Sequence, residues 1–206
     1  AGLQPNLAVS YNNNGSSGSV GYGWDINVPV ISIDTKYGIP TYDPTYETES
    51  YLRNGEELLL VPSPISPQKY LPHRSTTLQT RVSDAVFVTK VESSFSKIIR
   101  KGNSPSNYYW EVWDKSGTKY TYGGTVHPNN NFRNSVLRSH KTNPDAKFAK
   151  WYLSEVKDKN NNIVKYMYIE KEPPSTGVLK DGMEVYLSSI NYNKNTDHTP
   201  SAIENN

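Results

Sequence analysis

The sequence predicts an all-β fold in which antiparallel hairpins stack side by side and are joined by glycine- and proline-rich loops. Sixteen tyrosines, together with many valine, isoleucine and threonine residues, favour the half-buried surfaces of pleated sheets. Fourteen prolines and thirteen glycines supply turn residues along the chain. Short runs of alternating apolar and polar residues recur between these turns, as expected for strands with one buried face.

The length and composition of the chain exclude several classes of protein. Its 206 residues correspond to one large domain that can bury a substantial core. It has no cysteine, which excludes disulfides, thiolate catalysis and cysteine-based zinc sites. It contains no signal peptide and no apolar run of membrane length. Because it starts within a motif and stops in a polar tail, we expect a segment of a longer polypeptide.

The formal net charge is only +2, but the charges are distributed unevenly. Residues 1–50 contain one base and five acids, whereas residues 69–101 contain seven bases and two acids. Two oppositely charged faces that attract each other explain this pattern without any ligand. A patch that binds a polyanion is the alternative, but no nucleic-acid motif accompanies the charge. We therefore expect no nucleic-acid partner.

The chain begins with a strand, a glycine-rich crossing and a second strand. The first strand covers residues 7–11, and the second runs through residues 28–33. Between them, Gly21 and Gly23 flank a tyrosine and precede Trp24. Glycine accepts positive φ and allows another part of the chain to approach closely. These glycines therefore predict a tight bend that places Trp24 in the core.

A hairpin is expected over residues 51–61, with Asn54 and Gly55 at its turn. Both central positions of a type I′ turn need positive φ, which these two residue types tolerate. Several prolines follow between residues 62 and 72, and this spacing is incompatible with a regular element. Residues 63–84 are therefore predicted to form a proline-rich loop region.

Residues 108–122 read as an aromatic hairpin. A strand that contains Tyr108 and Trp110 is followed by a turn with Asp114 and Gly117, and the return strand ends in Tyr-x-Tyr. Alternate residues of a strand share a face, so Tyr108 and Trp110 should point the same way. Such hairpins cannot bury their apolar faces alone, and we expect them to stack against one another.

Residues 151–169 repeat this plan. The strand begins at Trp151, and Asp158 opens a turn in which Asn161 stands where a glycine is usual. Asparagine also tolerates the left-handed backbone conformation, so we expect the turn to form. A further strand is expected at residues 185–192.

The glycines, prolines and aromatic residues near the amino terminus form one ordered pattern. Its residues are Gly2, Leu3, Pro5, Leu7, Tyr11, Asn12, Gly18, Gly21, Gly23, Trp24, Pro29, Ile31, Gly38, Pro40, Tyr42 and Asp43. This pattern resembles the amino-terminal domain of the SpvB family. The same domain opens the B components of insecticidal toxin complexes and relatives of the Rhs and YD-repeat shell proteins. So many ordered matches are far more specific than a lone glycine motif.

The resemblance extends to about residue 192. Residues 53–62 and both aromatic hairpins are similar to segments of SpvB-like and Rhs-like shells. At residues 91–100 the apolar spacing fits a helix, but the similar family segment lies in strands, and we expect strands there. The residues that carry the structural motif are Gly21, Gly23, Trp24, Pro29, Gly38, Pro40, Asp114, Gly117, Trp151 and Asp158.

The resemblance implies a non-enzymatic structural module of a large secreted toxin or Rhs-like protein. In such families, β-sheets wind into a curved shell that encloses a carboxy-terminal effector. The implied partners are the rest of the same polypeptide and other toxin-complex or shell subunits, outside the cell or at its surface, without membrane insertion by this segment. We expect one structural domain with an entry motif and first hairpins (1–62), a loop region (63–84), a hairpin region (85–193) and a polar tail (194–206).

No group of residues indicates catalysis, a cofactor or a metal ion. The sequence has no G-x-S-x-G elbow. The histidines lie in polar or proline-rich surroundings, and none forms a metal-binding pair: they are His73, His127, His140 and His198.

Glu47 and Glu49 form an E-x-E pair, the catalytic signature of one class of ADP-ribosyltransferases, and SpvB itself carries such a domain. In those enzymes an arginine and a Ser-Thr-Ser motif precede the glutamates, whereas Arg74 follows them here. The enzymatic domain of the family also lies carboxy-terminal to the region matched here. We therefore interpret both glutamates as loop carboxylates without a catalytic role.

A carbohydrate-binding or adhesin-type β-module at the cell surface is the alternative function. Tyrosine and tryptophan on an exposed sheet can stack on sugars, and the candidates are Tyr108, Trp110, Tyr120 and Tyr122. Cross-strand packing explains the same residues and contributes about 0.2–1 kcal/mol per pair. A glycan is thus the second class of partner to test.

The strand expected at residues 185–192 is followed only by a polar tail. It is rich in apolar residues and has little charge to protect it. An unpaired strand of this kind is a template for pairing with another chain. We therefore expect self-association at this edge, or coverage of it by residues 193–206.

Overall fold

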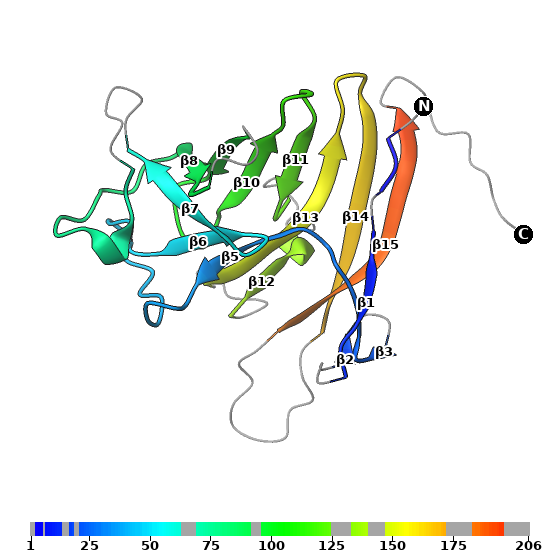
Figure 1. The fold of residues 1–206 in the computed structure, drawn as a ribbon, viewed down its shortest axis with the longest axis horizontal. Coiled ribbons are helices and arrows are strands. Elements are labelled where there is room, and N and C mark those ends of the chain that lie inside the picture. The colour runs from blue at the N-terminus through cyan, green and yellow to red at the C-terminus, as the bar shows by residue number, and fades with distance from the viewer. Residues whose placement is uncertain are drawn as a thin grey trace, which may run out of the picture.

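The computed structural model describes residues 3–5, 7–13, 17–18, 21–62, 69–91, 96–124, 133–139, 147–171 and 183–195. Within these residues the chain consists of strands and two single-turn 3-10 helices, connected by loops (Figure 1). The all-β class predicted from the sequence is confirmed.

The strands are short near the amino terminus and become long near the carboxyl terminus. They are β1 (Val9–Tyr11), β2 (Ser17–Gly18), β3 (Gly21–Tyr22), β4 (Trp24–Ile26), β5 (Val30–Asp34), β6 (Ser50–Arg53), β7 (Glu56–Val61), β8 (Ala85–Thr89), β9 (Lys97–Lys101), β10 (Tyr109–Trp113), β11 (Lys119–Tyr122), β12 (Val136–Arg138), β13 (Phe148–Lys157), β14 (Asn162–Lys171) and β15 (Glu184–Asn195). The 3-10 helices are η1 (Pro72–Arg74) and η2 (Arg133–Ser135).

Eight strands of the described chain form a closed ring of antiparallel pairs. The order is β5, β6, β7, β8, β9, β10, β11 and β13, and β13 pairs back onto β5. Consecutive strands are neighbours from β5 to β11, which confirms the predicted stacking of hairpins. β14 and β15 continue the sheet beyond the ring as a long antiparallel pair (Figure 1).

β13 closes the ring because its two halves have different neighbours. Residues 150–152 pair with β5, whereas residues 153–157 pair with β11. In addition, β14 pairs with residues 155–157 and β12 pairs with residues 148–151. One strand therefore joins the first hairpins of the chain to the last ones.

Aromatic side chains fill the interior of the ring. Trp110 and Trp151 meet edge to face with their ring centroids 5.9 Å apart. Tyr51 and Phe87 each lie 5.0 Å from Trp110, and all four side chains are at most 3% exposed. The Trp151 indole also donates a hydrogen bond of 2.8 Å to the carbonyl oxygen of Tyr108. Tyr108 and Trp110 are both at most 2% exposed, which agrees with the prediction that their side chains share one face.

Two local predictions for the middle of the chain are confirmed. Asn54 and Gly55 both have positive φ, of 51° and 85°, at the turn between β6 and β7. Residues 97–101 form strand β9 rather than a helix, and β9 pairs with both β8 and β10. Residues 92–95 of the ambiguous segment lie outside the described residues.

The two aromatic hairpins have the same turn. In each, the amide of the aspartate (Asp114 or Asp158) donates a 3.1 Å hydrogen bond to the carbonyl oxygen four residues later. Three residues after the aspartate, Gly117 and Asn161 have positive φ of 83° and 63°. Asparagine therefore adopts the left-handed conformation as predicted, and the repeated sequence plan produces repeated geometry.

The predicted burial of Trp24 is wrong. Trp24 is 46% exposed, because β1 and β4 form a separate two-stranded ribbon outside the barrel sheet. Gly23 does permit a close approach, with a φ of 76°, and the approaching groups are the backbone carbonyl oxygen of Asn12 and the ring of Tyr11. The Tyr11 and Trp24 rings lie 5.0 Å apart on the surface. The core is instead organised around Trp110 and Trp151.

Candidate functional site

The loop between β5 and β6 carries both carboxylates of the E-x-E pair, Glu47 and Glu49. Asp43 shapes the start of this loop, because its side chain accepts two backbone amides at 2.7 Å each. Backbone hydrogen bonds then join the loop to residues 79–81. This pairing places the side chain of Arg81 beside the two glutamates.

Arg81 and Arg100 hold the two carboxylates in ion pairs. Arg100, from β9, binds both oxygens of Glu47, with an Nη1–Oε2 distance of 2.8 Å. Arg81 binds Glu49 and also reaches Glu47 Oε2 at 3.2 Å. All four side chains are at most 4% exposed. Two positive and two negative charges thus lie together in the interior, and their mutual hydrogen bonds offset the cost of burying them.

The surroundings keep the arginines charged and the neighbouring tyrosines neutral. Burial alone would lower the pKa of Arg81 and Arg100, but attraction to the glutamates and neighbouring tyrosines, with hydrogen bonds to the glutamates, raises both values. Burial also raises the pKa of Tyr51 and Tyr108, against the opposing effect of Arg100. The Arg100 guanidinium lies 4.0 Å from the centroid of the Tyr108 ring, a cation–π contact inside the ring of strands.

This cluster has no free catalytic group. Glu47 and Glu49 lie in a loop, as expected, but they are buried and occupied by arginines rather than solvated. The remaining oxygen of Glu49, Oε1, accepts hydrogen bonds from the amide of Tyr42 at 2.7 Å and from the hydroxyl of Thr48 at 2.6 Å. A carboxylate that acts as a general base needs a free oxygen near a substrate. The geometry therefore fits a role in holding the loops onto the barrel.

The uneven charge of the sequence is largely neutralised within the fold. Four of the seven bases in residues 69–101 pair with acids of the chain. Arg81 and Arg100 pair with acids from residues 1–50, which confirms that the two charged stretches attract each other.

His73, the histidine within the described residues, has a packing role. Its ring stacks on Tyr37 at a centroid distance of 3.6 Å, and Nδ1 lies 3.2 Å from the Ser50 hydroxyl. His127, His140 and His198 fall outside the described residues. In the described ranges, no three histidine, aspartate or glutamate side chains gather as metal ligands would. These ranges also contain no helix with the length and apolarity needed to cross a membrane.

Three of the four aromatic residues considered as a sugar platform are buried. Tyr108, Trp110 and Tyr122 are at most 2% exposed, and Tyr120 is half-buried. The Tyr120 hydroxyl donates to the Asp114 carboxylate at 3.2 Å, which ties it to the hairpin turn. The burial of Tyr108, Trp110 and Tyr122 and the pairing of Trp110 with Tyr122 favour cross-strand packing for these residues.

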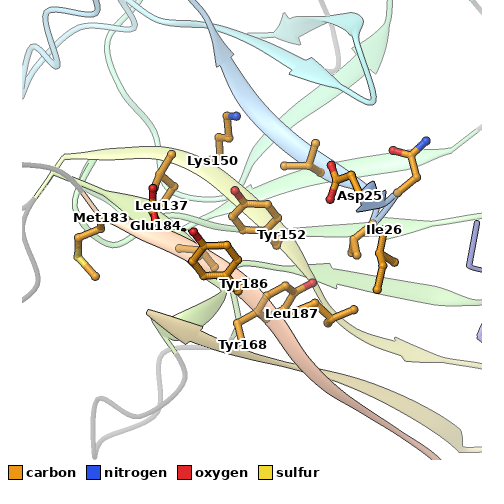
Figure 2. Close-up of a pocket in the computed structure, with 14 residues that line it drawn as sticks. Asp25, Ile26, Leu137, Lys150, Tyr152, Tyr168, Met183, Glu184, Tyr186 and Leu187 are labelled. Atoms are coloured by element: carbon orange, nitrogen blue, oxygen red, sulfur yellow. Dashed lines mark hydrogen bonds between the residues drawn. The ribbon is translucent and has the colours of Figure 1, made fainter. Parts of the chain in front are cut away.

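An open groove of about 470 Å³ lies beside the ring, between the β4–β5 connection and the start of β15 (Figure 2). Tyr152 and Tyr168 form part of its floor, and Tyr186 projects into it. Burial raises the pKa of Tyr152, and the nearby carboxylate of Asp25 adds to the rise. Sequence reasoning missed this groove because its two sides come from opposite ends of the chain.

The ten residues predicted to carry the structural motif do not form one site. They lie in or next to strands β3 and β4, before β5, in the loop after β5, in the two hairpin turns and in the core: Gly21, Gly23, Trp24, Pro29, Gly38, Pro40, Asp114, Gly117, Asp158 and Trp151. Pro29 has a clear contact, since its carbonyl oxygen accepts a 3.0 Å hydrogen bond from the Leu153 amide. Their importance for folding stays a prediction.

Comparison with known proteins identifies the family. The sequence profile described as "SpvB: Salmonella virulence plasmid 65kDa B protein" matches residues 1–204. The chain belongs to the SpvB family. Among curated proteins, none matches the sequence at a significant level.

Several solved structures share the fold of this chain. The N-terminal domain of effector protein SpvB from Salmonella typhimurium strain LT2 has a TM-score of 0.67 at 21% identity, over 93% of this chain and 59% of that one. A TcdB2-TccC3 crystal structure has a TM-score of 0.65 at 21% identity, and the match covers 92% of this chain and 9% of that one. The Photorhabdus luminescens Tc holotoxin pore has a TM-score of 0.63 at 20% identity, and the match covers 91% of this chain and 8% of that one. The chain thus spans about three fifths of the SpvB structure and under a tenth of the toxin-complex chains.

Proposed function

We propose that this chain is a non-enzymatic structural module of a large secreted toxin or Rhs-like protein. It contributes its barrel and the adjoining long strands to a shell that encloses a carboxy-terminal effector. The observation that carries this proposal is the match to the SpvB family over residues 1–204. The same fold within much longer toxin-complex chains supports it.

The geometry of the chain agrees with a structural role. Glu47 and Glu49 have the spacing of a catalytic pair, but both form buried ion pairs with Arg81 and Arg100. A ring of eight strands closed by one long strand gives a rigid unit with few open edges. The partners are the remainder of the same polypeptide and other subunits of the toxin complex, outside the producing cell.

Limited proteolysis of the complete toxin polypeptide tests the enclosure of an effector. With the module intact, we expect trypsin to spare the carboxy-terminal region long after exposed loops are cut. Deletion of this module should open the shell and expose that region to rapid cleavage. A matched control carries Asp84→Asn, which removes only an exposed ion pair with Lys101. Equal protection of the carboxy-terminal region with and without the module would contradict the proposal.

A further inference from the structure

His73 of η1 lies against the outer face of the β6–β7 hairpin. Tyr51 and Leu58 pair across this hairpin and belong to the core. Ser50 and Glu57 each precede one of them in the chain, so alternation along the strands directs both side chains to the opposite, outer face. His73 meets them there, and the hairpin therefore offers it one polar side chain from each strand.

The imidazole of His73 has a fixed orientation on this face. Its ring stacks on Tyr37, in the loop after β5, with a centroid distance of 3.6 Å and an interplanar angle of 9°. Nδ1 lies 3.2 Å from the Ser50 hydroxyl, and Nε2 lies 3.8 Å from Oε1 of Glu57. The side chains of His73 and Glu57 are only 12% and 10% exposed. The stacking and the hydroxyl contact together direct Nε2 at the carboxylate.

Nε2 of His73 and Oε1 of Glu57 are buried atoms without a hydrogen bond in the described part of the chain. Buried polar atoms nearly always have a partner, and the 3.8 Å between these two is just beyond hydrogen-bond range. A neutral imidazole has one N–H and can donate to Ser50 or to Glu57, but not to both. A protonated imidazole has two N–H donors and a charge opposite to that of the carboxylate, so it can serve both partners.

On the strand side, Glu57 faces His73, and a lysine binds the same carboxylate. Lys90, after β8, contacts the other oxygen of Glu57, Oε2, at 2.7 Å. Its side chain is 45% exposed, so water screens much of its charge, whereas Oε1 faces the imidazole in the interior. Arg74, the next residue of η1, lines a different pocket from the one beside His73. One carboxylate oxygen therefore remains for His73.

On the loop side, two acids line a pocket of about 270 Å³ beside the imidazole. Glu49 is bound by Arg81 in the buried cluster, and Asp34 accepts the backbone amide of Lys36 at 2.9 Å. The Lys36 ammonium lies 5.4 Å from the centroid of the Tyr37 ring. Because these two acids already have partners, the carboxylate of β7 is the one that faces Nε2.

We propose that His73 and Glu57 form an acid-strengthened latch, which holds η1 and the loop after β5 on the outer face of the β6–β7 hairpin. When the pH falls, the imidazole takes up a proton from solvent and Nε2–H donates to Oε1 of Glu57, while Nδ1–H donates to the Ser50 hydroxyl. The added stability is therefore present at low pH and is lost as the pH rises and the ring releases its proton. The latch acts within this chain, so it stands or falls separately from effector enclosure.

A double-mutant cycle in urea unfolding tests the latch on the chain itself. The variants are His73→Gln, Glu57→Gln and the double replacement, each unfolded at several values between about pH 8 and about pH 5, where histidine takes up its proton. We expect the coupling between the two residues to rise about fivefold in the unfolding equilibrium constant toward the lower pH. Glu111→Gln is the matched control. It removes a carboxylate of similar exposure, 13%, from a lysine pair on β10 and should leave the pH dependence as in the parent.

Two measurements on the folded chain accompany the cycle, so that a variant that fails to fold leaves the latch testable. The NMR signals of the His73 ring report its protonation directly, and at about pH 6 Glu57→Gln should leave a smaller fraction of the ring protonated. The amides of Arg74 and Ser75 donate to carbonyl oxygens within and next to η1. In the parent they should gain exchange protection as the pH falls, after correction for the intrinsic rate of exchange.

Any of three results would overturn the proposal. A coupling that stays constant or falls on acidification would show that proton uptake does not strengthen the contact. Equal protonation of His73 in the parent and in Glu57→Gln would show that the carboxylate does not hold the proton. Unchanged protection of the η1 amides in the parent would show that stacking on Tyr37 is what holds this segment.

Discussion

Glu47 binds two arginines that come from different parts of the chain. Arg81 lies in the segment between η1 and β8, and Arg100 lies in β9, so the carboxylate joins three segments at one buried point. The spacing of Glu47 and Glu49 is the same as in an enzyme signature, but spacing does not determine what surrounds a residue. The buried partners decide its role, and here both partners are cations with no room for a substrate between them.

Replacement of Glu47 by glutamine should therefore destabilise the protein strongly. It leaves Arg100 as a buried charge without a counterion, which costs about 3–5 kcal/mol in comparable buried pairs. Urea unfolding of Glu47→Gln measures the loss. Asp84→Asn removes a carboxylate from an exposed pair and should change stability by less than about 1 kcal/mol. Equal stability of the two variants would show that the buried cluster does not hold the loops in place.

Single residues were predicted well where the local backbone decides their conformation. The positive φ of Asn54, Gly55 and Asn161 follows from residue type and turn position alone. The surface position of Trp24 does not follow from local sequence, because it depends on whether the β1–β4 ribbon joins the barrel sheet. The local sequence of Gly21, Gly23 and Trp24 is the same whether the ribbon joins the barrel sheet or stays separate from it.

At the scale of elements, the repeated hairpin is the feature most readable from the sequence. β10–β11 and β13–β14 share their turn hydrogen bonds because the aspartate and the left-handed residue occupy equivalent positions. In the first hairpin, the Asp114 carboxylate also accepts the amides of Ser116 and Thr118, at 2.8 and 3.0 Å. These contacts lie within five residues, so local sequence is sufficient to predict them.

The two turns offer a paired test of the left-handed position. Asn161→Gly should preserve or slightly raise stability, because glycine has no Cβ penalty at a φ of 63°. Gly117→Ala should cost about 1–2 kcal/mol, since an alanine at a φ of 83° is strained even though no atom lies within 4 Å of its Cβ. Thermal unfolding of both variants provides the comparison. A gain from Gly117→Ala would mean that steric space, and not backbone conformation, governs this turn.

At the scale of the whole molecule, closure of the ring was beyond sequence reasoning. Each hairpin from β5 to β11 pairs with its neighbour in the chain, and stacking of hairpins predicts that order. β13 pairs with β11 on one side and with β5 on the other. The residues of β5 and β13 that pair lie more than one hundred positions apart in the chain. No local pattern marks such a partner, and the open groove beside β15 depends on the same long-range arrangement.

Trp151 should report whether the closed ring unfolds as one unit. It lies on β13 where the strand passes from β5 to β11, touches Trp110 and Tyr51, and donates to the Tyr108 carbonyl oxygen. Trp151→Ala leaves a large cavity at this junction and should cost about 3–5 kcal/mol. If closure couples all eight strands, amides in β7, on the far side of the ring, lose as much exchange protection as those in β13.

Trp24→Ala serves as the matched control, because Trp24 is exposed on the separate ribbon. Its replacement should leave the exchange protection of the barrel amides unchanged. Native-state hydrogen exchange measures all three proteins under the same conditions. Loss of protection confined to β13 and its direct neighbours in Trp151→Ala would contradict cooperative closure. The hairpins of the barrel would then open independently of one another, and the pairing of β13 would not make the eight strands unfold together.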